Sequence, residues 1–375
     1  MASHHVPGDL ADDAPRHFIS SPGAAAPGGT VSGDVPVEHP IEFTGSGSEY
    51  FRIWIVNLLL SVLTLGIYSA WAKVRSQRYL HANTRLDGAS FGYHARPAAI
   101  LKGRIVAVLL LIAYVVLTQE MQLTGLLIVL VAAVVLLPWL LYRSLRFRLA
   151  NTSYRALRFG FQAPLRKSYV VFALWPVLTL FTLYLLTPFT HRAIKAFQHN
   201  HSRYGSARFS FDARTRDFYL RYGAWLAGVV LAGGLPVLAA WLFLRDAGAG
   251  GMDGAEFFSV AWIWIYAVLL ATTPMLAASL RNLIWSRTRL GPNRIVSRVS
   301  PWKYFYIQAT NGLLTLLTLG LFVPFARIRR LRYLAACTAF VAAGDIGAFV
   351  AAAQDGPVGA AGDETADIFG IDIAL

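Results

Sequence analysis

Seven apolar segments, each about 20 residues long, constrain this chain more than any other feature. A helix needs ~20 residues to cross the hydrocarbon core of a bilayer. The chain is 56% hydrophobic and only 14% charged, whereas a soluble domain carries about 25% charged residues. The sequence therefore predicts a polytopic α-helical membrane protein, with apolar segments near 53–72, 100–118, 122–141, 169–189, 222–244, 258–279 and 304–325.

The charges of the chain are unevenly placed. Of its 20 acidic residues, six lie in 1–42 and six in 345–375, while 33 of the 34 Lys and Arg residues lie between these ends. A basic core with acidic ends indicates one face against anionic phospholipid headgroups. We do not expect a nucleic-acid partner, because the positive-inside bias already explains Lys and Arg beside membrane segments.

Two membrane topologies fit these segments. Seven spans in simple alternation put residues 190–221 and 280–303 outside, with seven and six Lys or Arg residues respectively, which the positive-inside bias disfavours. The other arrangement has four spans in two out-and-back pairs. Its three remaining segments are re-entrant, so each enters the membrane from the basic face and returns to that face. Breaks for such re-entrant segments are predicted at Asn57 and Ser61, at Pro176, and at Asn311-Gly312.

A common spacing favours the second arrangement. Five positions that end an apolar segment are each followed 14 residues later by Thr or Ser. Fixed spacing over several copies is typical of internal repeats. The pairs are Ala70 and Thr84, Pro138 and Thr152, Pro188 and Ser202, Pro274 and Thr288, and Pro324 and Thr338.

The predicted organisation follows from this spacing. Residues 1–40 form a disordered acidic tail, because they cannot bury enough apolar surface to order themselves. Residues 346–375 form an acidic C-terminal tail. The membrane domain, 41–345, is divided into five pseudo-repeats at approximately 41–90, 91–158, 159–208, 209–294 and 295–345.

Short strands are expected between the apolar segments. Asn83-Thr84 with Phe91, Asn151-Thr152 with Phe159, and His201-Ser202 with Phe209 read as short β-hairpins on the basic, cytoplasmic face. Lone hairpins are unstable in water, so we expect them to join into one sheet or small barrel that serves as a structural collar. The predicted fold class is a polytopic α-helical membrane protein with short β-hairpins on that face.

Two groups of polar residues are candidates for function. The first group consists of polar residues within apolar runs, which would face a cavity if the protein passes a solute. Its members are Asn57, Thr64, Asn311 and Thr318. Basic residues at helical spacing beside tyrosines are candidate contacts for anionic headgroups, although topology anchoring explains them as well. This second group is Lys73, Arg75, Arg78, Arg146, Arg327, Arg329 and Arg332.

Catalytic, metal and cofactor sites are not expected. The sequence has no Gly-rich phosphate loop, no His-Glu-x-x-His and no Gly-x-Ser-x-Gly motif. His191, His199 and His201 cluster, but the last two are spaced for a strand rather than for one helix face, which disfavours a metal site. The single Cys337 excludes an intrachain disulfide.

Several residues resemble the YjgN-like family of bacterial inner-membrane proteins. They are Phe43-Thr-Gly45, Glu49-Tyr50-Phe51, Asn57 with Thr64-Leu65-Gly66-Ile67-Tyr68, Trp71, Arg75, Tyr79, Asn83-Thr84, Gly88 and Phe91. The resemblance implies a multi-pass protein of the bacterial inner membrane and brings no settled activity. The chain departs from the motif at Pro324, Phe325 and Cys337.

Two functions remain open at this point. The first is channel-like or transporter-like passage of a small solute through a cavity among the repeated units. The second is a scaffold without transport that binds anionic lipid or an envelope protein partner through the Arg-rich face. The absence of ionisable residues well inside the apolar segments disfavours an ion-coupled pump.

Overall fold

Ten short strands close into an antiparallel barrel in the computed structural model of this chain, which describes residues 36–120, 122–246 and 254–355. Neighbours around the barrel follow the order β1-β10-β9-β8-β7-β6-β5-β4-β3-β2. The strands are β1 (Val37–Phe43), β2 (Thr84–Leu86), β3 (Ala89–Tyr93), β4 (Thr152–Tyr154), β5 (Leu157–Phe161), β6 (Ser202–Tyr204), β7 (Ala207–Phe211), β8 (Thr288–Leu290), β9 (Asn293–Ser297) and β10 (Thr338–Ala342).

The predicted fold class was wrong about these strands, which are not short hairpins attached to a helical protein. β1 pairs with β10 at one edge, Val37 opposite Ala342, and with β2 at the other, Ile41 opposite Leu86. This closure removes every free sheet edge, whose unpaired backbone groups are otherwise a liability. β1 also begins inside the segment assigned to the N-terminal tail.

The five pseudo-repeats are not supported by the structure either. The last unit has one strand, β10, which leads to the short helix α13 (Ile346–Asp355) instead of a second strand. The first strand of the barrel, β1, comes before any helix. The excursions between strands also differ, since some contain two long helices and others a short broken pair.

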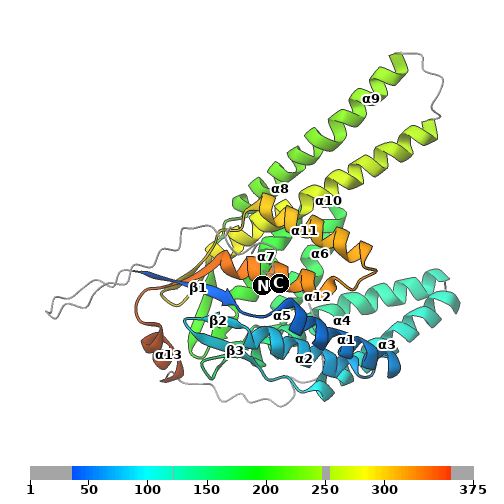
Figure 1. The fold of residues 1–375 in the computed structure, drawn as a ribbon. Coiled ribbons are helices and arrows are strands. Elements are labelled where there is room, and N and C mark those ends of the chain that lie inside the picture. The colour runs from blue at the N-terminus through cyan, green and yellow to red at the C-terminus, as the bar shows by residue number, and fades with distance from the viewer. Residues whose placement is uncertain (1–35, 121, 247–253, 356–375) are drawn as a thin grey trace, which may run out of the picture.

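Four long apolar helices are able to cross a membrane by length and composition. They cover Pro97–Gln119, Leu123–Ala150, Thr215–Arg245 and Gly254–Ser286, with 23, 28, 31 and 33 residues. They belong to two packed pairs that project from the barrel (Figure 1). The first pair is α3 (Pro97–Glu120) and α4 (Gln122–Ala150). In the second pair, one long helix consists of α8 (Thr215–Val229), the π-helical segment η3 (Val230–Gly234) and α9 (Leu235–Asp246), and it packs against α10 (Gly254–Ser286).

The other three apolar segments each fold into two helices joined by a tight turn. The pairs are α1 (Gly47–Leu63) with α2 (Ser69–Ala82), α6 (Trp175–Phe181) with α7 (Thr187–Asn200), and α11 (Pro301–Leu317) with α12 (Val323–Ala336). α5 (Leu165–Tyr169) and the π-helical segment η2 (Val170–Leu174) precede α6. Each pair starts after one strand of the barrel and leads back to the next.

The tips of these three turns are apolar and exposed. Leu65, Leu183 and Leu319 are 95%, 89% and 94% exposed. The turn amides are nonetheless bonded: Gly66 donates to Ser61, Tyr184 to Thr179 and Gly320 to Thr315, at 2.7–2.8 Å. Because lipid offers no hydrogen bonds to backbone groups, such turns suit membrane depth.

The sequence misplaced the breaks. Asn57 and Asn311 lie inside α1 and α11, and the turns come seven residues later, from Thr64 and Thr318 onward. Leu65 and Gly66 take positive φ angles of 49° and 90° there, and glycine adopts such values without a steric penalty.

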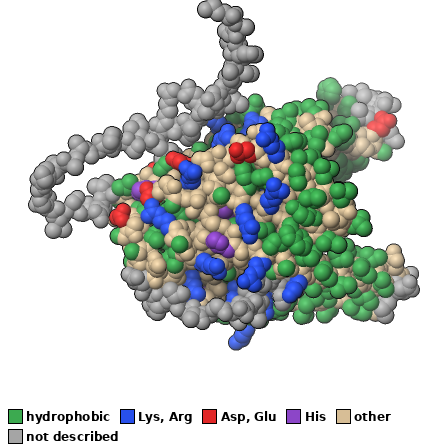
Figure 2. Space-filling view, turned by 60° about the horizontal axis from the view of Figure 1, so that its bottom comes forward, with side chains coloured by type: hydrophobic (Ala, Val, Ile, Leu, Met, Phe, Trp, Pro, Cys, Tyr) green, Lys and Arg blue, Asp and Glu red, His purple; other side chains and the backbone are tan. Residues whose placement is uncertain are grey.

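Hydrophobic and basic side chains separate on the surface. Figure 2 shows hydrophobic side chains covering the projecting helices, while Lys and Arg side chains gather over the rest of the visible face. The helices leave the barrel at the strand ends that connect to them, and we call this the membrane end of the barrel. The opposite end, with the strand-to-strand turns, is called its outer end.

Candidate functional site: a cavity inside the barrel

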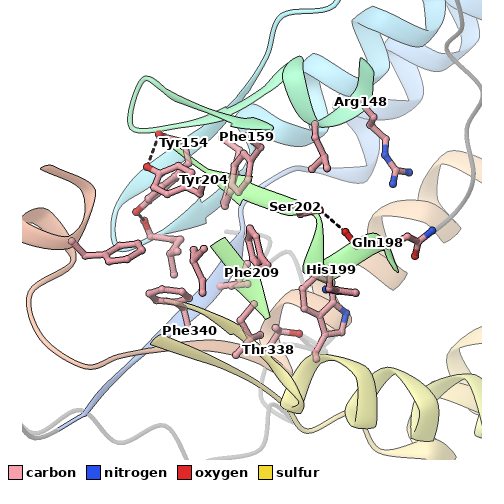
Figure 3. Close-up of a pocket in the computed structure, with 18 of the residues that line it drawn as sticks. Arg148, Tyr154, Phe159, Gln198, His199, Ser202, Tyr204, Phe209, Thr338 and Phe340 are labelled. Atoms are coloured by element: carbon pink, nitrogen blue, oxygen red, sulfur yellow. Dashed lines mark hydrogen bonds between the residues drawn. The ribbon is translucent and has the colours of Figure 1, made fainter. Parts of the chain in front are cut away.

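The inward-facing residues of the barrel, together with residues of the adjoining helices, line a cavity of about 300 Å³ (Figure 3). Side chains alternate between the two faces of a strand, so every second residue of each strand points inward. Aromatic rings form much of the wall, among them those of Phe91, Tyr154, Phe159, Tyr204, Phe209 and Phe340. Aliphatic residues Ile41, Leu86, Leu290 and Ile295 complete it.

The two tyrosine hydroxyls of the wall are occupied by backbone carbonyls. Tyr154 donates to the carbonyl of Leu86 at 2.8 Å, and Tyr204 donates to the carbonyl of Tyr154 at 2.9 Å. Burial raises the pKa of Tyr204 to about 12, so its hydroxyl stays protonated. These bonds tie neighbouring strand pairs together and leave this part of the wall apolar.

Helix α13 covers the outer end of the cavity. Its residues Ile346, Phe349 and Val350 line the cavity, and the Phe349 ring stacks on Tyr204 with 6.4 Å between centroids. The backbone amide of Ser206, in the β6–β7 turn, donates to the carbonyl of Ala353 at 2.9 Å. In Figure 1, α13 lies on the opposite side of the barrel from the projecting helices.

The membrane end of the cavity is polar and basic. Arg148 of α4, Gln198 and His199 of α7, Arg281 of α10, Ser202 and Thr338 line it. No Asp or Glu is among the lining residues. Both arginines are partly buried, and moving a charge out of water is costly because water solvates charge far better than a protein interior does.

Two polar atoms at this end lack a hydrogen-bond partner within the described part of the chain. They are Oε1 of Gln198 and Nε of Arg281, both buried. Arg281 also places its guanidinium carbon 5.8 Å from the centre of the Trp285 ring, and one terminal nitrogen 3.5 Å from Oγ1 of Thr338. A buried donor and a buried acceptor are thus available to a bound polar group.

Lys195 lies on α7 one helical turn before His199, behind the residues that line the cavity rather than among them. Burial, and secondarily the charge of Arg148, lowers the pKa of Lys195 to about 8. Burial, and secondarily Lys195, lowers the pKa of His191 and of His199 to about 4. At neutral pH the histidines are therefore uncharged, and Lys195 and the two arginines carry the positive charge.

The structure places the four predicted cavity residues elsewhere. Nδ2 of Asn57 donates to the carbonyl of Ala72 at 3.4 Å, and Nδ2 of Asn311 to that of Ala326 at 3.2 Å, across their helix pairs. Thr64 and Thr318 bond within their turns, each accepting from the amide four residues later. None of the four lines the barrel cavity.

The predicted headgroup contacts lie on α2, α4 and α12, outside the cavity. Three of those on α12 bond to other parts of the protein: Arg327 donates to the Tyr50 hydroxyl, Arg329 to Oγ1 of Thr310, and Arg332 to the carbonyl of Gly45, at 2.7–3.1 Å. The remaining members, Lys73, Arg75, Arg78 and Arg146, are likewise not cavity residues.

The sequence analysis missed Arg148, Lys195, Gln198 and Arg281. The clustered histidines bind other groups: His191 Nδ1 lies 3.0 Å from the Tyr222 hydroxyl, and His201 Nδ1 lies 2.8 Å from the Phe197 carbonyl. Within the described ranges, no three His, Cys, Asp or Glu side chains are grouped to hold a metal ion.

Comparisons with known proteins agree with a membrane protein. The family described as "Bacterial protein of unknown function (DUF898)" matches residues 38–368. "Inner membrane protein YjgN" of Salmonella typhimurium strain LT2 is 33% identical over 157 residues, which cover 40% of this chain and 38% of that protein. The protein of that name from Escherichia coli O157:H7 is 34% identical over 146 residues, 39% of this chain and 36% of that protein.

These matches confirm the resemblance stated from the sequence. They span well under half of each relative's length. No solved structure matches this chain.

Proposed function

The chain belongs to the DUF898 family of bacterial proteins of unknown function, and we propose that it binds an anionic amphiphile in the barrel cavity. It is a protein of the bacterial inner membrane, with four helices able to span it. In the proposed complex, the apolar part of the ligand lies against the aromatic wall. Its anionic group lies at the membrane end, beside Arg148, Lys195 and Arg281.

One observation carries this proposal: an apolar cavity ends at two partly buried arginines, and none of the described residues that line it is an Asp or Glu. Ligand pockets are typically apolar with a few placed polar groups that fix orientation. An anion at this end would be attracted by the positive charge of the arginines, and charge-assisted hydrogen bonds to arginine are the stronger kind. The unpartnered Nε of Arg281 supplies a donor for such a group.

Passage of a small solute, the first hypothesis from the sequence, is less well supported. A water-filled path needs polar or small residues along its wall, whereas the wall between β3 and β9 is aromatic and aliphatic. Helix α13 also covers the outer end of the cavity. The arrangement therefore favours retention of a ligand over passage, and we propose binding without a catalytic step.

The scaffold hypothesis also includes binding of an anionic lipid, but we propose the barrel cavity as the binding site instead of the Arg-rich face. The α12 arginines named for headgroup binding already donate to protein oxygens, which favours a bracing role for them. The envelope protein partner stays a prediction.

The test uses a photoreactive probe that reports position. Full-length protein in nanodiscs would be incubated with decanesulfonate carrying a diazirine at its chain end, and labelled residues would be mapped by mass spectrometry. A decanol with the same diazirine is the uncharged control. We expect the sulfonate to label the aromatic wall or α13 about tenfold more efficiently, since a hydrogen bond to a charged group contributes roughly 1.5–3 kcal/mol.

Matched variants identify the source of this preference. Arg281→Gln and Lys195→Met should remove the preference for the sulfonate, while Arg208→Gln, on the outer face of the barrel, should leave it unchanged. Equal labelling by sulfonate and alcohol in the unaltered protein, or labelling confined to the lipid-facing helices, would overturn the proposal.

A further inference from the structure

The outer face of the barrel carries a row of arginines, one on each of five neighbouring strands. Four of these side chains are exposed and that of Arg203 is half-exposed. We call this set the arginine row, and its members are Arg158 of β5, Arg203 of β6, Arg208 of β7, Arg289 of β8 and Arg294 of β9.

Like charges in the row stand directly opposite one another. Arg203 pairs with Arg208 across β6 and β7, and Arg289 pairs with Arg294 across β8 and β9. Directly opposed like charges destabilise a sheet. In the described residues one carboxylate pairs with the row, Asp212, at 3.6 Å from Arg289. The row thus has a local excess of positive charge that an external anion would relieve.

The position of the row favours a soluble anion over lipid headgroups. Arg158, Arg208 and Arg294 each stand within two residues of a strand-to-strand turn, at the outer end of the barrel. The helices enter and leave at the opposite end (Figure 1). A bilayer surface around the helices is therefore separated from these side chains by most of the strand length.

The C-terminal segment starts next to this row. α13 ends at Asp355, and the carbonyl of Ala353 accepts from the amide of Ser206, in the turn between Arg203 and Arg208. Residues 356–375 follow, with four acids (Asp363, Glu364, Asp367 and Asp372) and no Lys or Arg. Twenty extended residues span up to ~65 Å, more than enough to cross five strands that are about 5 Å apart.

We propose that segment 356–375 binds the arginine row and covers it against other polyanions. The charges are complementary, and the covalent connection gives the segment a high effective concentration at the row. The contact is electrostatic and exposed, so it weakens as salt is added. This inference does not depend on the ligand of the cavity.

Distance measurements in the full-length chain test this contact. Spin labels would be placed on Ser210→Cys, exposed on β7 within the row, and on Ala366→Cys in the segment. Cys337 is 2% exposed, and the chain without added cysteines controls for its labelling. We expect a population of short distances in low salt that is lost at 1 M salt, where the screening length is about 3 Å.

Two charge variants decide between outcomes. In the first, Asp363, Glu364, Asp367 and Asp372 are all changed to Asn or Gln, which keeps the segment length. In the second, Arg203, Arg208, Arg289 and Arg294 are changed to Gln. Both should abolish the short distances while thermal unfolding verifies the fold. Short distances that persist in either variant, or that are absent from the unaltered sequence in low salt, would overturn the inference.

Discussion

The backbone amide of Ser206 donates to the carbonyl of Ala353 at 2.9 Å, and this bond fixes the end of α13 to the β6–β7 turn. The preceding Gly205 has φ +55°, and a Cβ built on it would lie 2.3 Å from the same carbonyl oxygen. Helix α13 thus closes the outer end of the cavity through a contact that tolerates only glycine at this position.

Gly205→Ala should loosen this closure. The added methyl group clashes with the Ala353 carbonyl and strains a left-handed backbone, which costs about 1–3 kcal/mol. We expect a lower thermal midpoint and faster labelling of the cavity wall by the decanesulfonate probe. Gly291→Ala is the matched control, because its φ is +57° and its nearest neighbour is a Phe349 side-chain carbon at 3.5 Å. Equal effects of the two substitutions would mean that strain alone, and not the α13 contact, is responsible.

The membrane helices were largely predictable from sequence, whereas the barrel was not. Apolar length is a local property, so the four spans follow from their own residues. Barrel closure depends on β1 meeting β10, with Val37 opposite Ala342, and no local pattern in either strand identifies a partner some 300 residues away. The sequence analysis also took Pro138 and Pro274 as the ends of apolar segments, whereas α4 and α10 continue through these prolines.

The cavity was missed for a related reason. Arg148 and Arg281 look like any basic residue beside a membrane segment, which the positive-inside bias explains. Only the closed barrel brings them together with Gln198. Asn57, by contrast, stood out as a polar residue in an apolar run, yet its Nδ2 serves to join α1 to α2.

The turns at the tips of the short helix pairs should depend on their threonines. Oγ1 of Thr64 accepts from the amide of Tyr68 at 2.9 Å, and Oγ1 of Thr318 accepts from that of Phe322 at 3.0 Å. Replacing both with Val leaves two amides without a partner in lipid, at roughly 1–3 kcal/mol each. We expect a lower thermal midpoint in nanodiscs, while the double Thr→Ser variant, which keeps the hydroxyl groups, unfolds like the unaltered chain. Unchanged stability of the Val variant would place these turns in water.

Lys195 should make anion binding depend on pH. Its folded-state pKa is about 8, below the usual 10.5, so between these values the unfolded chain holds a proton that the folded chain has lost. The free energy of unfolding therefore rises with pH across this window. We expect binding to have the opposite trend, because the positive charge of Lys195, next to the lining residues Arg148 and His199, is lost as pH rises through about 8. Decanesulfonate keeps its charge, so its labelling yield should fall between pH 7 and 9.5, and Lys195→Met should flatten this profile. An equally steep profile in that variant would assign the titration to another group.

Filling the cavity should block the probe without altering the charges around it. Ile295 lines the wall and is 9% exposed, and its neighbour Val296 lies on the opposite face of β9. Ile295→Phe places a ring in the cavity, where empty volume limits the overpacking penalty. We expect about tenfold weaker labelling of the wall, which corresponds to ~1.4 kcal/mol, with little change in thermal midpoint. Val296→Phe adds the same ring to the same strand outside the cavity, so it should label like the unaltered protein. Undiminished labelling of Ile295→Phe would place the bound chain outside the barrel.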